Sequence, residues 1–243
     1  MNWERLERDN ATADEQVKLK RLQFELRKKV PSPISGQDVF RLGGGGRMDE
    51  KDPLKWLRLQ TEEIANRAAK GIGSVVGEEK LRVAWLATGP FGSGIFDMLH
   101  KKGVSIPWFQ HGFTCDEFGF HDFADFGYYG DTNEYKHKLT PLEEIARHNL
   151  HNGWGGRGLE RWVRSVTDVC RDLKIDAVVQ YLHTGCVTTG GLAQVTAEIL
   201  EKELGISVLN IQGRQNDWNE DKEREFQKNV GEFVDMCIAN KKR

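Results

Sequence analysis

The feature that most constrains the fold is an alternation of short apolar segments with amphipathic segments, which begins near residue 80. Strands that alternate with helices in this way form a parallel sheet with helices on both of its faces. We therefore predict an α/β fold with a small parallel, doubly wound sheet of the flavodoxin or Rossmann type. Pro107 lies in the second strand and indicates an irregular or edge position for it. The expected strands are 81–87, 104–109, 176–182 and 207–211, and the expected helices are 93–102, 140–150, 158–173, 189–204 and 219–240.

In the first 76 residues the apolar residues have helical spacing instead. This pattern predicts a helical N-terminal segment ahead of an α/β domain at 77–243. Thr12 and Glu15 have the spacing of a capping box, and an apolar face follows at helical intervals, made of Leu19, Leu22 and Leu26. A helix of about 13–29 is therefore expected, and the two prolines that follow it should end it.

A second helix is expected after four consecutive glycines at 43–46. These glycines lack the preceding strand and the Lys-Ser/Thr pair of a phosphate-binding loop, so they predict a flexible loop. Asp52 and Pro53 are typical of the start of a helix, and Gly71 should end it. Small and apolar residues form one face between them: Leu54, Leu57, Thr61, Ile64, Ala65 and Ala68.

Charge and hydropathy exclude several classes of protein. The chain has 35 Lys and Arg residues against 37 Asp and Glu residues, a formal net charge of −2. A general nucleic-acid binder would need a large basic surplus instead. No apolar run approaches the roughly 18–20 residues that span a bilayer, and the N-terminus does not resemble a signal peptide. We therefore expect a cytoplasmic protein without a membrane or nucleic-acid partner.

The four cysteines fall into two groups. None forms a CxxC pair, so zinc-ribbon and thioredoxin-like sites have no support, and a disulfide framework is not expected in a chain of this size. Cys170 and Cys237 lie on the apolar stripes of helices, where a thiol behaves as a small buried hydrophobe. Cys115 and Cys186 each follow a strand and should lie at the same rim of the sheet, because ligand sites form beyond the carboxyl ends of parallel strands. Two such thiols are the minimum of a soft-metal or iron–sulfur site, although loop cysteines can also be incidental.

The segment 182–191 is the richest local feature, because it runs from a strand into a helix N-terminus. Backbone N–H groups and the helix dipole favour anions there, and would lower the pKa of a thiol or support a cluster sulfide. Thr184 and Gly185 are therefore candidate cofactor-binding residues, and His183 is a candidate to donate or shuttle a proton. In the alternative interpretation, His183 binds a backbone carbonyl and the threonines at 188–189 cap the helix.

Other chemistries have weaker support. A Cys–His nucleophile would need a third group that orients the histidine, and the sequence does not identify one. The stretch 89–94 occupies the place of a dinucleotide loop, but it lacks the GxGxxG register and a clearly placed acidic residue. The carboxylates and aromatic residues within 111–135 are more typical of a folded aromatic lid than of an acid–base pair.

Several motifs together resemble one known family. They are the run 29–36 (KVPSPISG), the strand 83–86 (VAWL), Cys115 after the second strand, Gly185-Cys186 after the third, and the run 204–213 followed by Asp217. With these motifs, nearly the whole chain resembles the 2-hydroxyacyl-CoA dehydratase component D family, which includes the benzoyl-CoA reductase subunits.

This resemblance implies a subunit that binds a [4Fe–4S] cluster through three cysteines, within a heterodimer of homologous subunits. It also implies an acyl-CoA substrate and an ATP-dependent iron–sulfur activator that supplies one electron at low potential. In the dehydratases a ketyl radical expels the hydroxyl group, whereas in the reductases electrons enter an aromatic ring. On this resemblance Cys115 and Cys186 take the places of the second and third cluster ligands, and His183, Thr184 and Gly185 lie beside them.

The chain also departs from the family pattern. Family members are longer, and a preceding α/β domain supplies their first cysteine, whereas no cysteine precedes Cys115 here. The chain is then half of a split subunit, a truncated form, or a relative that has lost the cluster. The alternative function is a non-catalytic scaffold that keeps the fold and docks a catalytic subunit. A flavodoxin-like nucleotide binder that uses 89–94 is a third interpretation.

Overall fold

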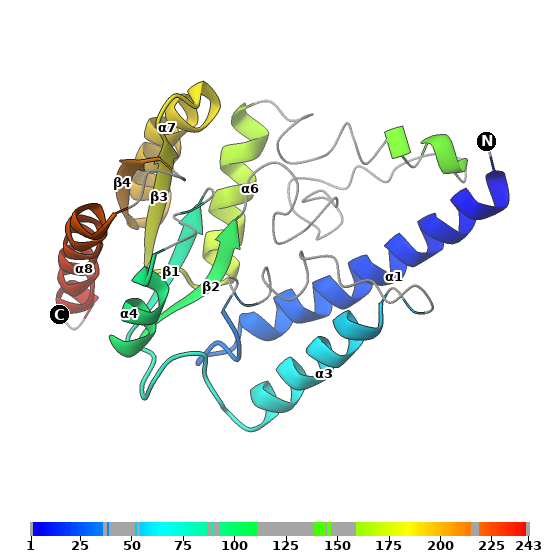
Figure 1. Ribbon diagram of the computed structural model, residues 1–243, viewed down its shortest axis with the longest axis horizontal. Helices are drawn as coiled ribbons and strands as arrows, with labels where there is room; N and C mark the ends of the chain where they lie inside the picture. The colour runs from blue at the N-terminus through cyan, green and yellow to red at the C-terminus, as the bar shows by residue number, and fades with distance from the viewer. Residues whose placement is uncertain are drawn as a thin grey trace.

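Four parallel strands form one sheet in the computed structural model, which describes residues 2–35, 38, 52, 54–86, 89, 93–110, 139–143, 145–146, 159–214 and 219–241. The strands are β1 (Leu81–Leu86), β2 (Val104–Gln110), β3 (Ala177–His183) and β4 (Ser207–Gly213). They are all parallel and lie in the order β2-β1-β3-β4 (Figure 1). This arrangement confirms the predicted α/β class.

Helices cover both faces of the sheet. One face packs against α6 (Leu159–Asp172) and α7 (Val187–Leu204), and the other packs against α4 (Ile95–Lys101) and α8 (Glu220–Lys241). Successive side chains of a strand point to opposite faces. In β1 this places Ala84 and Leu86 in the first core and Val83 and Trp85 in the second. The sheet is therefore doubly wound, as predicted.

The strands lie within two residues of their expected positions, and β1 is buried along its whole length. The expectation for Pro107 is also confirmed. β2 is an edge strand, and its register with β1 shifts between Arg82 and Ala84. A proline is tolerated at such a position because the ladder is already interrupted there.

The N-terminal segment contains α1 (Trp3–Arg27) and α3 (Lys55–Ala69), which pack against each other (Figure 1). The expected start of the first helix was wrong. Asn2 caps α1 by accepting a hydrogen bond from the backbone N–H of Arg5 at 3.0 Å. Thr12 lies inside the helix, and its hydroxyl donates to the carbonyl of Arg8 at 3.0 Å. A capping-box pattern in the middle of a helix is therefore not a boundary.

The expected apolar face of α1 was also wrong in part, because Leu22 is 47% exposed. The buried side chains of this helix instead include Gln23, Phe24 and Arg27. Gln23 donates to the hydroxyl of Thr61 in α3 at 2.8 Å, and Arg27 donates to the carbonyl of Pro107 in β2 at 3.0 Å. Polar side chains are buried here because each meets a hydrogen-bond partner from a distant part of the chain.

The second helix agrees with the prediction at its buried face and at its end, but it begins at Lys55, with Leu54 and not Asp52 at the N-cap. Leu57, Thr61 and Ile64 form the buried face of α3. Gly71 follows the helix with a φ of +67°, and the N–H of Ile72 donates to the carbonyl of Arg67 at 2.9 Å. This pattern is a Schellman end, for which glycine is preferred. The glycines at 43–46, the loop 111–135 and most of the helix expected at 140–150 lie outside the described residues.

A buried arginine joins the N-terminal segment to the sheet. The guanidinium of Arg82 donates to the carbonyls of Arg27 at 2.7 Å, Lys29 at 3.0 Å and Leu173 at 2.7 Å. It also pairs with the Glu79 carboxylate at 2.8 Å, and both side chains are 3% exposed. The segment after α1 is thereby held against the start of β1. The division of the chain near residue 76 stays a prediction.

Of the helices that the structure describes, none is both long enough and apolar enough to cross a bilayer.

Candidate functional site

The strand order defines where a ligand site should lie. From β1 the chain goes to β2 on one side, and from β3 it goes to β4 on the other, so β1 and β3 flank the topological switch point. Open α/β sheets bind ligands in the crevice beyond the carboxyl ends of such strands. Gly89 follows β1 there, with a φ of +102° and its carbonyl bound by the indole N–H of Trp85 at 3.0 Å. The residues 183–186 follow β3 on the other side of the crevice.

A tight turn connects β3 to α7. The N–H of Cys186 donates to the carbonyl of His183 at 3.0 Å, and Gly185 has a φ of +89°. A turn of this kind with a positive φ at its third residue favours glycine. Thr184 is anchored to the end of β4, because its N–H and its hydroxyl both donate to the carbonyl of Gly213, at 3.0 and 3.2 Å. The turn is therefore held to β4 at Thr184, the first of its two central residues.

Cys186 is the N-cap residue of α7. Its backbone is extended, its side chain is half-buried, and the first turn of the helix contains no acidic residue. The N–H groups of a first helical turn lack intrahelical acceptors and favour negative charge nearby. The start of α7 therefore favours an anion near Cys186, although this side chain makes no capping hydrogen bond itself. The helix begins at Val187, so the threonines at 188–189 lie inside the first turn and not at the cap.

At the N-terminus of α4, the helix that follows β1, a side chain of the protein already accepts the hydrogen bonds. The carboxylate of Glu223 in α8 accepts hydrogen bonds from the Ser93 hydroxyl and the Gly94 N–H, both at 2.9 Å. The N–H of Ile95 in turn donates to the Ser93 oxygen at 3.0 Å. A dinucleotide fold places its pyrophosphate at this helix N-terminus. Because the protein's own carboxylate holds the position, the geometry argues against a nucleotide site after β1.

His183 is the last residue of β3 and is half-buried. Its ring meets the ring of Tyr181 edge to face, with centroids 5.5 Å apart. The Tyr181 hydroxyl donates to the carbonyl of Arg214 at 3.2 Å, and burial raises the pKa of this phenol. His183 is therefore held at the rim of the sheet two residues before the turn glycine. Its predicted role in proton transfer stays a prediction.

Cys170 and Cys237 are core residues, as predicted. Cys170 is packed in the core between the sheet, α6 and α7, and Cys237 in the core on the opposite face. Burial raises the pKa of both thiols, with a further increase at Cys237 from Asp176 and an opposing effect of its hydrogen bond with Ser207. Neutral, covered thiols are poor nucleophiles and poor metal ligands.

The contact between Tyr181 and Gly213 was not predicted from the sequence. A Cβ atom at Gly213 would lie 2.9 Å from Cζ of Tyr181, closer than real Cβ contacts allow. Only glycine therefore fits beside the buried phenol. In the sequence, Tyr181 lies in one apolar segment and Gly213 follows the next one. Nothing in the sequence indicates that these two residues meet.

Cys115 lies outside the described residues, so the predicted convergence of its thiol with that of Cys186 stays a prediction. Within the part of the chain that the structure describes, no three His, Cys, Asp or Glu side chains are grouped so that they could hold a metal ion. A complete ligand set would therefore need residues from outside this part.

The fold and its switch point define a doubly wound α/β protein with a candidate site between the ends of β1 and β3. The family model described as 2-hydroxyglutaryl-CoA dehydratase, D-component, matches residues 1–237. The chain therefore belongs to this family, and the resemblance inferred from its motifs is confirmed. The match spans the N-terminal helices as well as the sheet. A comparison with curated proteins found no match.

Proposed function

We propose that the chain is an iron–sulfur subunit of a 2-hydroxyacyl-CoA dehydratase or of a related aromatic acyl-CoA reductase. The observation that carries the proposal is the position of Cys186 in a member of the D-component family. This cysteine caps α7 at the carboxyl end of β3, beside the switch point of the sheet. The position combines a sulfur ligand with the positive end of a helix dipole.

Of the described residues, Cys186 would be one ligand of a [4Fe–4S] cluster at this point. Such clusters are held by cysteine thiolates and carry negative charge, and Cys186 lies at the N-cap of α7, the positive end of the helix dipole. Cys115 and Cys186 would supply the second and third ligands, and a partner or a preceding domain would supply the first. A bound cluster would provide single electrons at low potential.

The residues around the thiol would have supporting roles. Gly185 allows the turn that places Cys186 at the helix start, and Thr184 fixes this turn to β4. Groups that hold a metal ligand from behind in this way fix its orientation. A departing hydroxyl group must take up a proton to leave as water. His183 lies within the same turn and is the candidate donor.

The proposal includes partners. The description of the family as the D-component of a dehydratase supports a further component and an acyl-CoA substrate. By the same resemblance, an ATP-dependent iron–sulfur activator would deliver the electron, and a homologous subunit would complete a heterodimer.

The test is reconstitution in the absence of oxygen. The chain is purified together with its partner component, supplied with iron and sulfide, and analysed for bound iron and by EPR after reduction. The proposal expects about four iron atoms per [4Fe–4S] site and an EPR signal of a reduced cluster. A colourless, iron-free complex would contradict it and would identify the chain as the non-catalytic scaffold.

A further inference from the structure

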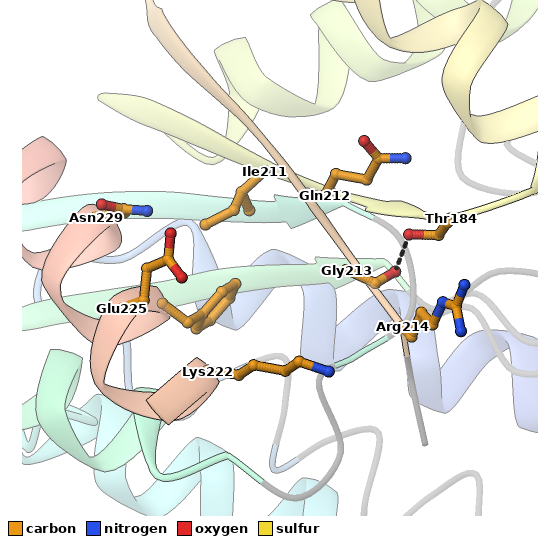
Figure 2. Close-up of a pocket in the computed structure, with 9 residues that line it drawn as sticks. Thr184, Ile211, Gln212, Gly213, Arg214, Lys222, Glu225 and Asn229 are labelled. Carbon is orange, nitrogen blue, oxygen red and sulfur yellow. Dashed lines mark hydrogen bonds between the residues drawn. The ribbon is translucent and has the colours of Figure 1, made fainter. Parts of the chain in front are cut away.

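A pocket of about 310 Å³ opens between the carboxyl end of β4 and the N-terminal part of α8 (Figure 2). Its volume is at the lower end of the range for small-molecule sites. Thr184 lines it, so the pocket adjoins the turn that carries Cys186. The roles assigned above to the end of β3 do not use this space.

The walls of the pocket are held in place. Tyr181 donates to the carbonyl of Arg214 at 3.2 Å, and Thr184 binds the carbonyl of Gly213, so the end of β4 is fixed from the β3 side. Phe226 is buried at the base of the pocket, with its ring centroid 5.8 Å from Tyr181 and 6.2 Å from Trp85. A pocket with fixed walls loses little freedom when a ligand binds.

The charged groups of the pocket favour an anion. Arg214 and Lys222 line it together with one carboxylate, that of Glu225, which leaves a formal charge of +1. In Figure 2 the Lys222 side chain points toward Arg214, whereas Glu225 lies toward the opposite end of the pocket. The Arg214 guanidinium forms no ion pair with the residues that the structure describes. It can therefore offer its donors to a ligand.

Two other carboxylates near the start of α8 bind groups that do not belong to the pocket. Glu223 accepts hydrogen bonds from Ser93 and Gly94, and Asp221 pairs with Arg224. Ser93, Gly94 and Arg224 do not line the pocket. The pocket therefore combines a cationic side with an apolar wall that Ile211 and Phe226 provide.

From this arrangement we infer that the pocket binds an oxyanion of the acyl-CoA ligand, either a phosphate of CoA or a carboxylate on the acyl chain. Arginine matches both groups because its planar fork donates two parallel hydrogen bonds, and lysine adds a point charge. The apolar wall would contact the carbon skeleton next to the oxyanion. The inference rests on the proposed function, because that function supplies the class of ligand.

The test is a binding measurement on the oxygen-free complex with its partner component but without the activator. CoA, valeryl-CoA and glutaryl-CoA are titrated by calorimetry into the unaltered complex and into complexes with Arg214→Gln or Lys222→Gln. Lys228→Gln is the matched control, because this lysine lies on α8, is 71% exposed at its side chain and does not line the pocket. Each pocket variant should weaken binding about tenfold, as expected for the loss of a charged hydrogen bond, and the control should not.

The three probes separate the sources of the oxyanion. If the pocket holds a phosphate, both variants weaken the binding of all three probes equally. If it holds an acyl carboxylate, only the binding of glutaryl-CoA weakens. Unchanged affinities in both variants, or no binding of any probe to the unaltered complex, would overturn the inference. Iron is measured on the same samples: full iron content with unchanged affinities refutes the pocket alone, and an iron-free complex with a tenfold effect refutes the iron–sulfur function alone.

Discussion

Replacement of Arg82 by methionine should lower the free energy of unfolding by about 3–5 kcal/mol, the range for a buried ion pair that loses one partner. Glu79 would keep a buried carboxylate without its cation, although the N–H of Ser32 also binds it at 2.8 Å. Three backbone carbonyls would lose a donor as well, those of Arg27, Lys29 and Leu173. The change is measured by urea unfolding followed by circular dichroism.

Arg171→Met is the matched control for this prediction. Arg171 also forms an ion pair, with Asp168, but its side chain is 54% exposed. Exposed pairs contribute little to stability, so this variant should unfold at nearly the same urea concentration as the unaltered protein. Equal unfolding midpoints for the Arg82 and Arg171 variants would show that the buried network does not hold the N-terminal segment to the sheet.

Replacement of Cys186 by alanine should abolish stable iron binding and reduce turnover by more than about 100-fold. Loss of a residue that only supports a metal ligand already costs about 10–100-fold in affinity or activity. A ligand itself should cost more. Iron content and activity are measured on the variant purified with its partner component and supplied with the activator.

Cys237→Ala is the control for this thiol. Cys237 is buried in α8 against the sheet, and burial raises its pKa, so its sulfur is not expected to bind iron. This variant should keep its full iron content, even if it is somewhat less stable. A Cys186 variant that retains iron and activity at the level of the Cys237 variant would refute the ligand role.

Much of the sheet could be predicted because its signals are local. A strand that is buried on both faces reads as a continuous apolar run, and β1 and β3 have this character. Pro107 marks the irregular edge strand because proline itself imposes the constraint. The apolar stripe expected in α8 is also confirmed, with Cys237 buried. Local pattern was sufficient in each case.

The buried face of α1 could not be predicted, because it depends on partners far along the chain. Arg27 is buried since the carbonyl of Pro107, 80 residues later, accepts its hydrogen bond. Gln23 is buried since Thr61 lies beside it. Helical periodicity identifies apolar residues, so it favoured Leu22, which in fact faces solvent.

The candidate site could also be predicted only in part. A strand end followed by a helix start was expected within 182–191, but α7 begins at Val187, two residues before the expected start. The pairing of Glu223 with the start of α4 could not be read from the sequence, because 129 residues separate Glu223 from Gly94. This pairing is what argues against a nucleotide after β1, so the sequence alone had left that interpretation open.

The most direct test of the account is thiol labelling of the complex with iodoacetamide before and after iron loading, read out by mass spectrometry. We expect Cys115 and Cys186 to be labelled in the iron-free complex and to become protected together when iron binds. Cys170 should stay unlabelled in both states, because it is fully buried and burial raises its pKa. An iron-loaded complex in which Cys186 is still labelled as fast as before would contradict the central claim that this thiol binds the cluster.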